Sequence, residues 1–251
     1  MKRAAALAAL ALVLLAGCGG DEEAGTTDTT TTTSEETTQV SVYWLLDGKV
    51  WPVLREVDET DAVAGAALEA LLEGPTQEEE DELALSTAIP EGTRLESVTV
   101  DGGVARVELS AELPEEPLAQ VVYTASQFPT VESVEIGDES YTRADFEDVT
   151  PAILVESPRF FEEVGNPVRA TGTANTFEAN FQYELTDTDG RIVDSGFVTA
   201  TSGSGERGTF DFTTAEYEIP FDGVGALIVY EASAEDGSRI NLVEIPVRMT
   251  R

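Results

Sequence analysis

The chain of 251 residues contains no histidine and a single cysteine, Cys18. Without histidine, Ser-His-Asp triads, most zinc sites and the usual general base are excluded. With one cysteine, no intramolecular disulfide can form, so the fold depends on core packing. The stretch TSGSGERG, from Thr201 to Gly208, lacks the Lys-Ser/Thr of a phosphate-binding loop and is expected to be an ordinary loop. We therefore predict no cofactor, no metal site and no enzyme activity.

Positive charge is also scarce. Fourteen Lys and Arg residues stand against 49 Asp and Glu residues, which gives a formal net charge of −35. Such an acidic surface repels nucleic acid and anionic lipid headgroups, so no nucleic-acid partner is expected. Among so many carboxylates, pairs arise by chance. A peptidoglycan-modifying carboxylate pair is therefore kept only as an alternative, and it predicts a deep cleft with one carboxyl of raised pKa.

Long apolar runs are missing except at the start. Ala4 to Ala16 is wholly apolar, but thirteen helical residues are only about 20 Å long, too short for a hydrocarbon core of about 30 Å. The positive charges of Lys2 and Arg3 precede this run. Together these features fit a signal peptide over residues 1–17.

The end of the signal peptide, Leu15-Ala16-Gly17-Cys18, resembles the lipobox of bacterial lipoproteins at all four positions. This resemblance implies cleavage between Gly17 and Cys18, a diacylglyceryl group on the Cys18 thiol and acylation of the new N-terminus. Two or more acyl chains anchor a protein stably. We expect a lipid anchor on the extracytoplasmic face of a bacterial cell membrane. An ordinary signal peptide that happens to end near a cysteine is the alternative.

Residues 18–39 follow as a Thr-rich, acidic segment. After Cys18 it has six acids, no base and no large apolar residue, so it cannot bury a core and is predicted to be disordered. We interpret it as a tether, whose 21 residues after Cys18 span about 25 Å as a flexible coil and about 70 Å when fully stretched. Such tracts can be O-glycosylated, but a plain spacer is the simpler interpretation.

Residues 40–148 predict an α+β domain in the order β-β-α-β-β-α-β. Asp47-Gly48 joins two strand-like runs, 40–46 and 49–57, in a hairpin. A second hairpin is expected over 94–110 and a last strand over 131–137. The two helices are placed in 60–76 and 114–129 by their apolar faces. These faces are Val63, Ala66, Ala67, Ala70 and Leu71, and then Leu118, Val121, Val122, Ala125 and Phe128.

The acidic segment after the first helix has no helical or strand period. Its run EEEDE, Glu78 to Glu82, is interpreted as a solvated loop, with weak divalent-ion binding as a remote alternative.

Residues 149–251 predict an all-β, immunoglobulin-like sandwich. Seven short strand-like runs are separated by Gly- and Asp-rich turns, without helical periodicity. One strand is expected to turn Phe177, Ala179, Phe181, Tyr183 and Leu185 to one side. Asp187 and Asp189 lie in a DTDG stretch that fails the spacing of a calcium loop, so a hairpin turn is favoured.

Four aromatic residues are candidates for a partner surface. Trp44 and Trp51 flank the first hairpin, where core packing is the simpler interpretation and exposure would make them the first choice for a binding site. Phe160 and Phe161, next to Pro158, are expected to plug the junction between the two domains.

Two family resemblances cover nearly all of the chain after the tether. Residues 40–148 resemble a GerM (sporulation and spore germination) domain through ALEALLEGPT, LSTAIPEGTRLESVTVDGGVARVELS and LAQVVYTASQFPTVESVEI. Residues 152–251 resemble the immunoglobulin-like domain of bacterial spore germination through VRATGTANTFEANFQYELTDTDG, DSGFVTATSG and ASAEDGSRINLVEIPV. The resemblance implies modules that self-associate or dock partners in the envelope, and it carries no catalytic motif.

The sequence thus predicts a non-catalytic, lipid-anchored envelope protein. Its expected partners are the membrane, through Cys18, and an envelope protein or a second copy of the chain, with cell-wall glycan as a further possibility. A solute-binding lipoprotein is a second alternative, although that class normally needs two larger lobes around a cleft.

Overall fold

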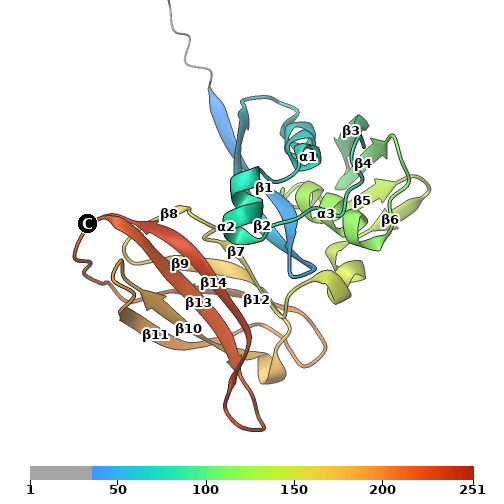
Figure 1. The fold of residues 1–251 in the computed structure, drawn as a ribbon. Coiled ribbons are helices and arrows are strands. Elements are labelled where there is room, and N and C mark those ends of the chain that lie inside the picture. Colours follow the sequence, from blue (N-terminus) through green and yellow to red (C-terminus); the bar gives the residue numbers. More distant parts are fainter. Residues whose placement is uncertain (1–35) are drawn as a thin grey trace, which may run out of the picture. The chain divides into compact units, whose positions relative to one another are not determined.

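The structure is a computed structural model, and it describes residues 36–251. Gly17, Cys18 and the tether up to residue 35 lie outside the described residues. The N-terminal part combines helices and strands, whereas the regular elements of the C-terminal part are strands apart from one short 3₁₀ turn (Figure 1). This confirms the predicted fold class. Within residues 36–251, no helix is both long and apolar enough to cross a membrane.

The N-terminal part begins with the hairpin of β1 (Thr37–Leu46) and β2 (Lys49–Asp58), joined at Asp47-Gly48 as predicted. Strand β1 begins three residues before the predicted start at Val40. Its β-branched Thr37 and Thr38 pair with Asp58 and Val57 at the far end of β2, which explains the extension.

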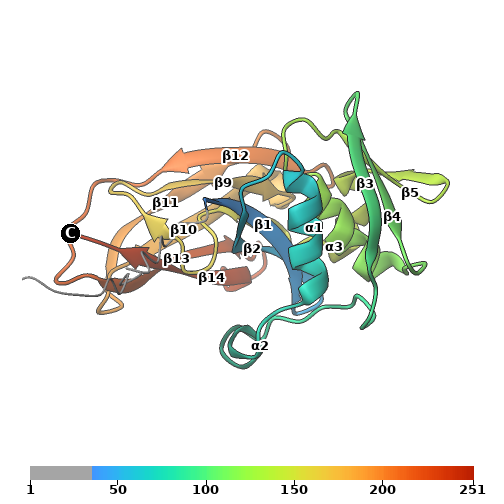
Figure 2. The same cartoon turned by 90° about the horizontal axis from the view of Figure 1, so that it is seen from above.

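Two helices cover the hairpin, and a four-stranded sheet covers the helices. The helices are α1 (Val63–Glu73) and α3 (Glu115–Ala125). The sheet has the order β3-β4-β5-β6, with bounds Leu95–Asp101, Val104–Leu109, Ser133–Ile136 and Glu139–Tyr141. Because β4 and β5 are parallel, α3 serves as the crossover between them. Figure 2 shows α1 and α3 lying between the hairpin and strands β3 and β4.

The acidic run Glu78–Glu82 is helical, so its interpretation as a loop was wrong. It lies in α2 (Gln77–Leu83), which buries none of its residues. The Thr76 side chain accepts a hydrogen bond from the Glu79 backbone N–H, and the Glu79 carboxylate accepts one from the Thr76 N–H. This capping box, with three acids in the first turn, stabilises a short and mostly exposed helix, whose last residue, Leu83, is partly buried against the core.

Helix α3 buries polar side chains because they complete the free edge of β1. Gln120 donates from Nε2 to the Tyr43 carbonyl at 3.1 Å, and Thr124 Oγ1 accepts from the Tyr43 N–H at 3.0 Å. Just after the end of α3, Gln127 accepts from the Ser41 N–H and donates to the Ser41 carbonyl. The helix and the residue that follows its C-cap thus satisfy backbone groups that a neighbouring strand would otherwise pair.

A short 3₁₀ segment, η1 (Arg143–Val149), leads from β6 to β7 (Ile153–Ser157). The Arg143 guanidinium contacts the Glu156 carboxylate at 2.5 Å, and the Tyr43 hydroxyl donates to the same carboxylate at 2.7 Å. Arg143 also lies over the Tyr123 ring, 4.7 Å from its centroid. Buried apolar side chains from both sides of the predicted domain boundary at residues 148 and 149 pack in one cluster. The hairpin and the sandwich therefore share one continuous core.

The C-terminal part is a sandwich of two sheets (Figures 1 and 2). One sheet has the order β12-β9-β7 and the other has the order β11-β10-β13-β14-β8. The remaining bounds are β8 (Glu163–Val164), β9 (Arg169–Ala174), β10 (Asn180–Thr186), β11 (Ile192–Thr199), β12 (Gly208–Thr213), β13 (Gly223–Ala232) and β14 (Arg239–Met249). Phe181, Phe210 and Phe212 pack together inside the sandwich.

The predicted alternation of β10 holds only for its second half. Phe181, Tyr183 and Leu185 are buried, as expected. Phe177 and Ala179 are not in the strand, because residues Phe177–Ala179 form the 3₁₀ turn η2. Glu178 and Ala179 have positive φ angles of 53° and 59°, which breaks the two-residue period and leaves Phe177 63% exposed.

Candidate functional site

The two tryptophans face each other across the hairpin, but they are core residues. Trp44 pairs with Trp51 in the β1–β2 register, and the two side chains are 0% and 4% exposed. The Trp44 indole donates to the Leu71 carbonyl at 3.3 Å, and Arg55 lies 4.3 Å from the Trp44 ring centroid. In this structure the tryptophans therefore do not form a partner surface.

Phe160 and Phe161 differ in exposure. Phe160 is buried and packs edge-on against Trp51, with ring centroids 6.2 Å apart, so it fills the junction as predicted. Phe161 is partly exposed, with its backbone at φ 58°, and Arg248 lies over its ring at 5.9 Å. Of the four aromatic candidates, Phe161 alone reaches the surface.

The two acidic stretches considered for ion binding, Glu78 to Glu82 and the DTDG stretch with Asp187 and Asp189, show no ion site. Asp187 accepts hydrogen bonds from the backbone N–H groups of Asp189 and Arg191, and its carboxylate pairs with the Arg191 guanidinium at 2.9 Å. These bonds to the ionised form lower the pKa of Asp187. They form the predicted hairpin turn between β10 and β11. Within residues 36–251, no three His, Cys, Asp or Glu side chains are grouped to hold a metal ion.

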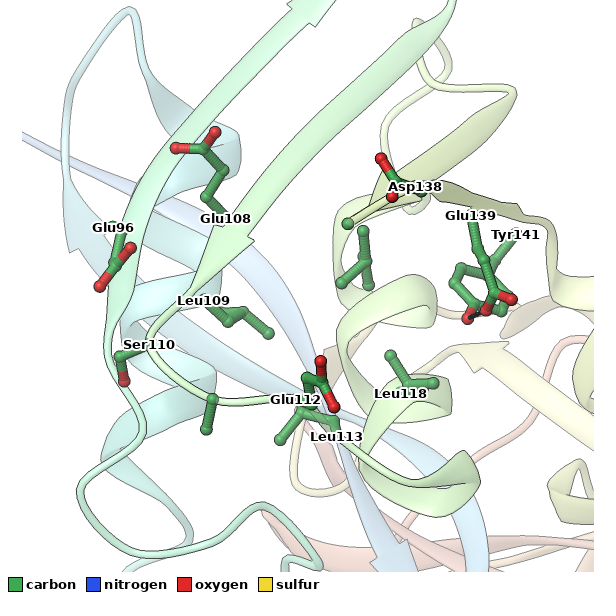
Figure 3. A pocket seen from close by; sticks show the side chains of 13 residues that line it. Glu96, Glu108, Leu109, Ser110, Glu112, Leu113, Leu118, Asp138, Glu139 and Tyr141 are labelled. Carbon is green, nitrogen blue, oxygen red and sulfur yellow. Dashed lines mark hydrogen bonds between the residues drawn. The ribbon is translucent and has the colours of Figure 1, made fainter.

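A cavity of about 690 Å³ lies in the N-terminal part and was not predicted. It forms where β4 and β5 separate, since their pairing ends at Val107 and Ile136. Beyond this point β5 turns at Gly137, with φ 64°, into β6, while the chain after β4 continues over the start of α3. Figure 3 shows the side chains that line this cavity, which we call the acidic pocket.

The floor of the acidic pocket is apolar. Leu118 projects from the first turns of α3, whose start is set by Pro114 at the N-cap and by Glu115 and Glu116 at the positive end of the helix. Each of the floor side chains is half-buried. They are Leu109, Leu113, Leu118, Ile136 and Tyr141.

The charged side chains on the rim of the acidic pocket are carboxylates, and the uncharged Ser110, Ala111 and Gly137 line it beside them. Glu108 accepts a hydrogen bond from Ser97 Oγ at 2.7 Å, and Glu139 accepts one from the Tyr141 hydroxyl. That bond to an anionic acceptor raises the pKa of Tyr141, with burial as a smaller cause. Among residues 36–251, no Lys or Arg lines the cavity. The acidic rim residues are all exposed, and they are Glu96, Glu108, Glu112, Asp138 and Glu139.

Sequence reasoning missed the acidic pocket because its residues come from separate segments. Glu112 and Leu113 lie in a loop, Glu108 and Asp138 lie on or next to strands, and nothing distinguished them among 49 acids. One usable signal was Leu118, which belonged to the predicted helical face. Leu118 is only half-buried, whereas Val121, Val122 and Ala125 on that face are buried.

Comparisons with known proteins match the two parts separately. Residues 41–137 match the family model described as "Sporulation and spore germination", and residues 152–238 match the model described as "Immunoglobulin-like domain of bacterial spore germination". A comparison with curated proteins gives no match.

Two similar solved structures come from the sporulation protein GerM of Bacillus subtilis. Its tandem GerMN domains are 23% identical, with a TM-score of 0.35, over 49% of this chain and 48% of that one. Its first GerMN domain is 22% identical, with a TM-score of 0.31, over 40% of this chain and 81% of that one. This chain therefore spans about half the length of the tandem structure. From the family models we conclude that residues 41–137 form a GerM-like sporulation and spore germination domain and that residues 152–238 form an immunoglobulin-like domain of bacterial spore germination.

Proposed function

We propose that this protein is a lipid-anchored, extracytoplasmic docking module without catalytic activity, and that the acidic pocket is where it docks an envelope protein. The observation that carries the proposal is the pocket itself, an open cavity of about 690 Å³ with a half-buried apolar floor and an ionised rim. Half-buried leucines at a surface cavity are free to gain contacts when a partner covers them. The lipobox-like residues Leu15 to Cys18 support the anchor, and the two family matches support an envelope role related to spore germination.

The carboxyl groups support a docking role over an enzymatic one. A peptidoglycan-modifying pair requires one carboxyl whose pKa is raised. Within residues 36–251, each carboxyl whose pKa departs clearly from its usual value has that pKa lowered. These groups are Glu79, Asp145, Glu147, Glu162, Asp187, Asp211 and Asp236.

The shape of the acidic pocket also disfavours the solute-binding alternative. That class encloses its ligand between two lobes, whereas this pocket is lined only by residues 96–141 of the N-terminal part. Its rim side chains are exposed, so a small ligand would stay largely in water. Such a site suits a protein partner, whose surface around the bound segment shields the open pocket from water.

The anchor is tested by fractionation of cells that express the full chain. We expect the wild type in the membrane fraction, and Cys18→Ala in the soluble fraction or as an uncleaved precursor. A Ser202→Ala variant, changed in an ordinary loop, serves as the control. Wild-type protein that leaves the membrane in a high-salt wash would contradict a lipid anchor, because acyl chains are held by the hydrophobic effect.

Docking is tested by capture from gently solubilised membranes, with Cys18 intact. Ala111 is exposed and lines the acidic pocket, so Ala111→Trp fills it without disturbing the core. Thr99→Trp, on the exposed face of β3, is the matched control. We expect wild type and Thr99→Trp to capture the same envelope protein and Ala111→Trp to fail to capture it. Unchanged capture by Ala111→Trp would show that docking uses another surface.

A further inference from the structure

The negative charge of the acidic pocket is not neutralised within the described chain. None of its five carboxylates forms an ion pair with residues 36–251. The nearest base along β4, Arg106, pairs instead with Glu135 on β5 at 2.8 Å. A partner that brings positive charge would therefore relieve repulsion among the rim carboxylates as well as gain attraction to them.

The positions of the carboxylates suit an extended peptide segment better than a metal ion. Figure 3 shows Glu96 and Glu108 on one side of the pocket and Asp138 and Glu139 on the other, with Leu109, Leu118 and the fifth carboxylate, Glu112, between them. A metal ion needs several oxygens converging on one point, and the described residues offer no such group. Carboxylates spread over both sides and the middle of a pocket with an apolar floor instead match an extended segment with separate side chains.

We infer that the acidic pocket binds an extended basic segment of a different protein, in which Lys or Arg residues flank an aliphatic or aromatic side chain. The apolar side chain lies on the floor formed by Leu109, Leu113 and Leu118, and the flanking cations reach the carboxylates on the two sides. This inference rests on the proposed docking function and specifies the chemistry of the partner.

Residues 36–251 of a second copy do not supply such a segment. The described residues contain one lysine, Lys49, whose ammonium donates to the Asp148 carbonyl. The sequence Arg248-Met249-Thr250-Arg251 has the right pattern, but Met249 is 1% exposed inside β14. The net charge of −35 also opposes contact between copies. The occupant is therefore a basic partner.

Fluorescence anisotropy with the full chain in detergent micelles tests the inference. The probe is a labelled nine-residue peptide with a central Leu and two Lys on each side. Matched peptides replace the Leu with Ser or the four Lys with Glu. We expect the Lys-Leu peptide to bind most tightly, the Ser peptide to bind more weakly and the Glu peptide not to bind. Spermidine, which has charge without an apolar group, should compete poorly.

Two double variants with the same change in net charge locate the binding. Glu112→Gln with Asp138→Asn removes two rim charges and should lower the affinity for the Lys-Leu peptide about tenfold. Glu56→Gln with Glu59→Gln removes two exposed charges near the end of β2 and should leave the affinity within about twofold. Equal losses in the two variants, or equal binding of the Lys and Glu peptides, would overturn the inference.

The two levels of the proposal fail separately. If Ala111→Trp abolishes capture of the envelope partner while no Lys peptide binds, docking at the pocket stands and the basic segment is wrong. If Ala111→Trp changes neither capture nor peptide binding, the acidic pocket is not the docking site and both proposals fall.

Discussion

Gly172 on β9 has no room for a side chain. A Cβ there would lie 2.0 Å from the Leu154 carbonyl oxygen and 2.8 Å from Phe210 Cζ. The oxygen belongs to the backbone of β7 and cannot move aside, so the sheet itself must deform. We expect Gly172→Ala to lower the free energy of unfolding by about 1–3 kcal/mol or more. Urea unfolding of the full chain measures this.

Gly165 provides the control for Gly172. A Cβ there would lie 3.8 Å from the Pro167 carbonyl oxygen, which is ordinary contact. Gly165→Ala should change stability by less than about 1 kcal/mol. If Gly172→Ala unfolds at the same urea concentration as Gly165→Ala, the close approach of β7 and β9 is not as described.

Thr124 tests the hydrogen bonds that complete β1. Thr124→Val keeps the shape of the side chain but leaves the buried Tyr43 N–H without its acceptor. An unsatisfied buried donor costs about 1–3 kcal/mol, so we expect a loss of that size in thermal or urea unfolding. Thr99→Val, on the exposed face of β3, should be nearly neutral. Equal stabilities of the two variants would show that water replaces the Thr124 hydroxyl.

At the scale of the element, the capping box of α2 makes stability depend on pH. Burial would raise the pKa of Glu79, but hydrogen bonds from Arg55 and Thr76 and the charge of Arg55 lower it overall. A lowered pKa in the folded state means that the stabilisation is complete above the pKa of the unfolded chain, about 4.3. It is lost as the pH falls through the lower folded value.

Glu79→Gln should therefore be less stable than wild type at pH 7, by about 1 kcal/mol or less, since the pair with Arg55 is partly exposed. The difference should close below pH 4. Urea unfolding from pH 3 to 7 measures it, with Glu82→Gln, an exposed acid of the same helix, as the control. A difference that stays constant across this range would exclude a charge effect.

The predicted elements with strong local signals are present in the structure. Asp47-Gly48 makes the first hairpin, and the second predicted hairpin is formed by β3 and β4, with Ala105 and Val107 buried. Helix α2 was missed because its acidic run was interpreted as a solvated loop. The signal for a helix start, Thr76 followed three residues later by Glu79, was not used. That signal was present in the sequence and agrees with the structure.

Other features of the elements depend on distant neighbours and could not be predicted locally. Gln120 and Thr124 are buried because β1, about 80 residues earlier, presents an open edge to them. The left-handed turn at Glu178 and Ala179 lacks the glycine that normally marks such a conformation. The acidic pocket likewise requires the separation of β4 and β5, which is a property of the sheet and not of either strand.

For the whole molecule, charge makes salt a stabiliser of the fold. With a net charge of −35, repulsion within the folded chain dominates at pH 7, and screening weakens it. We expect a step from 0.05 to 0.5 M NaCl to raise the melting temperature by about 2–4 °C. Near pH 4.1, where the net charge approaches zero, the same step should have little effect. Destabilisation by salt at pH 7 would show that ion pairs such as Arg143 with Glu156 outweigh the repulsion.

The order of the chain adds a consequence to the way β1 is completed. The side chains that bond to β1, Gln120 and Thr124 of α3 and Gln127 just after it, lie 77 to 86 residues further along the chain. At about 5–20 residues per second, they leave the ribosome roughly 4–17 seconds after the strand they cover. Throughout that interval the edge of β1 is open to pairing with another chain. The first strand of the described chain is thus among the last whose edge is satisfied. Until α3 has been synthesised, avoiding aggregation through β1 depends on whatever binds the nascent chain.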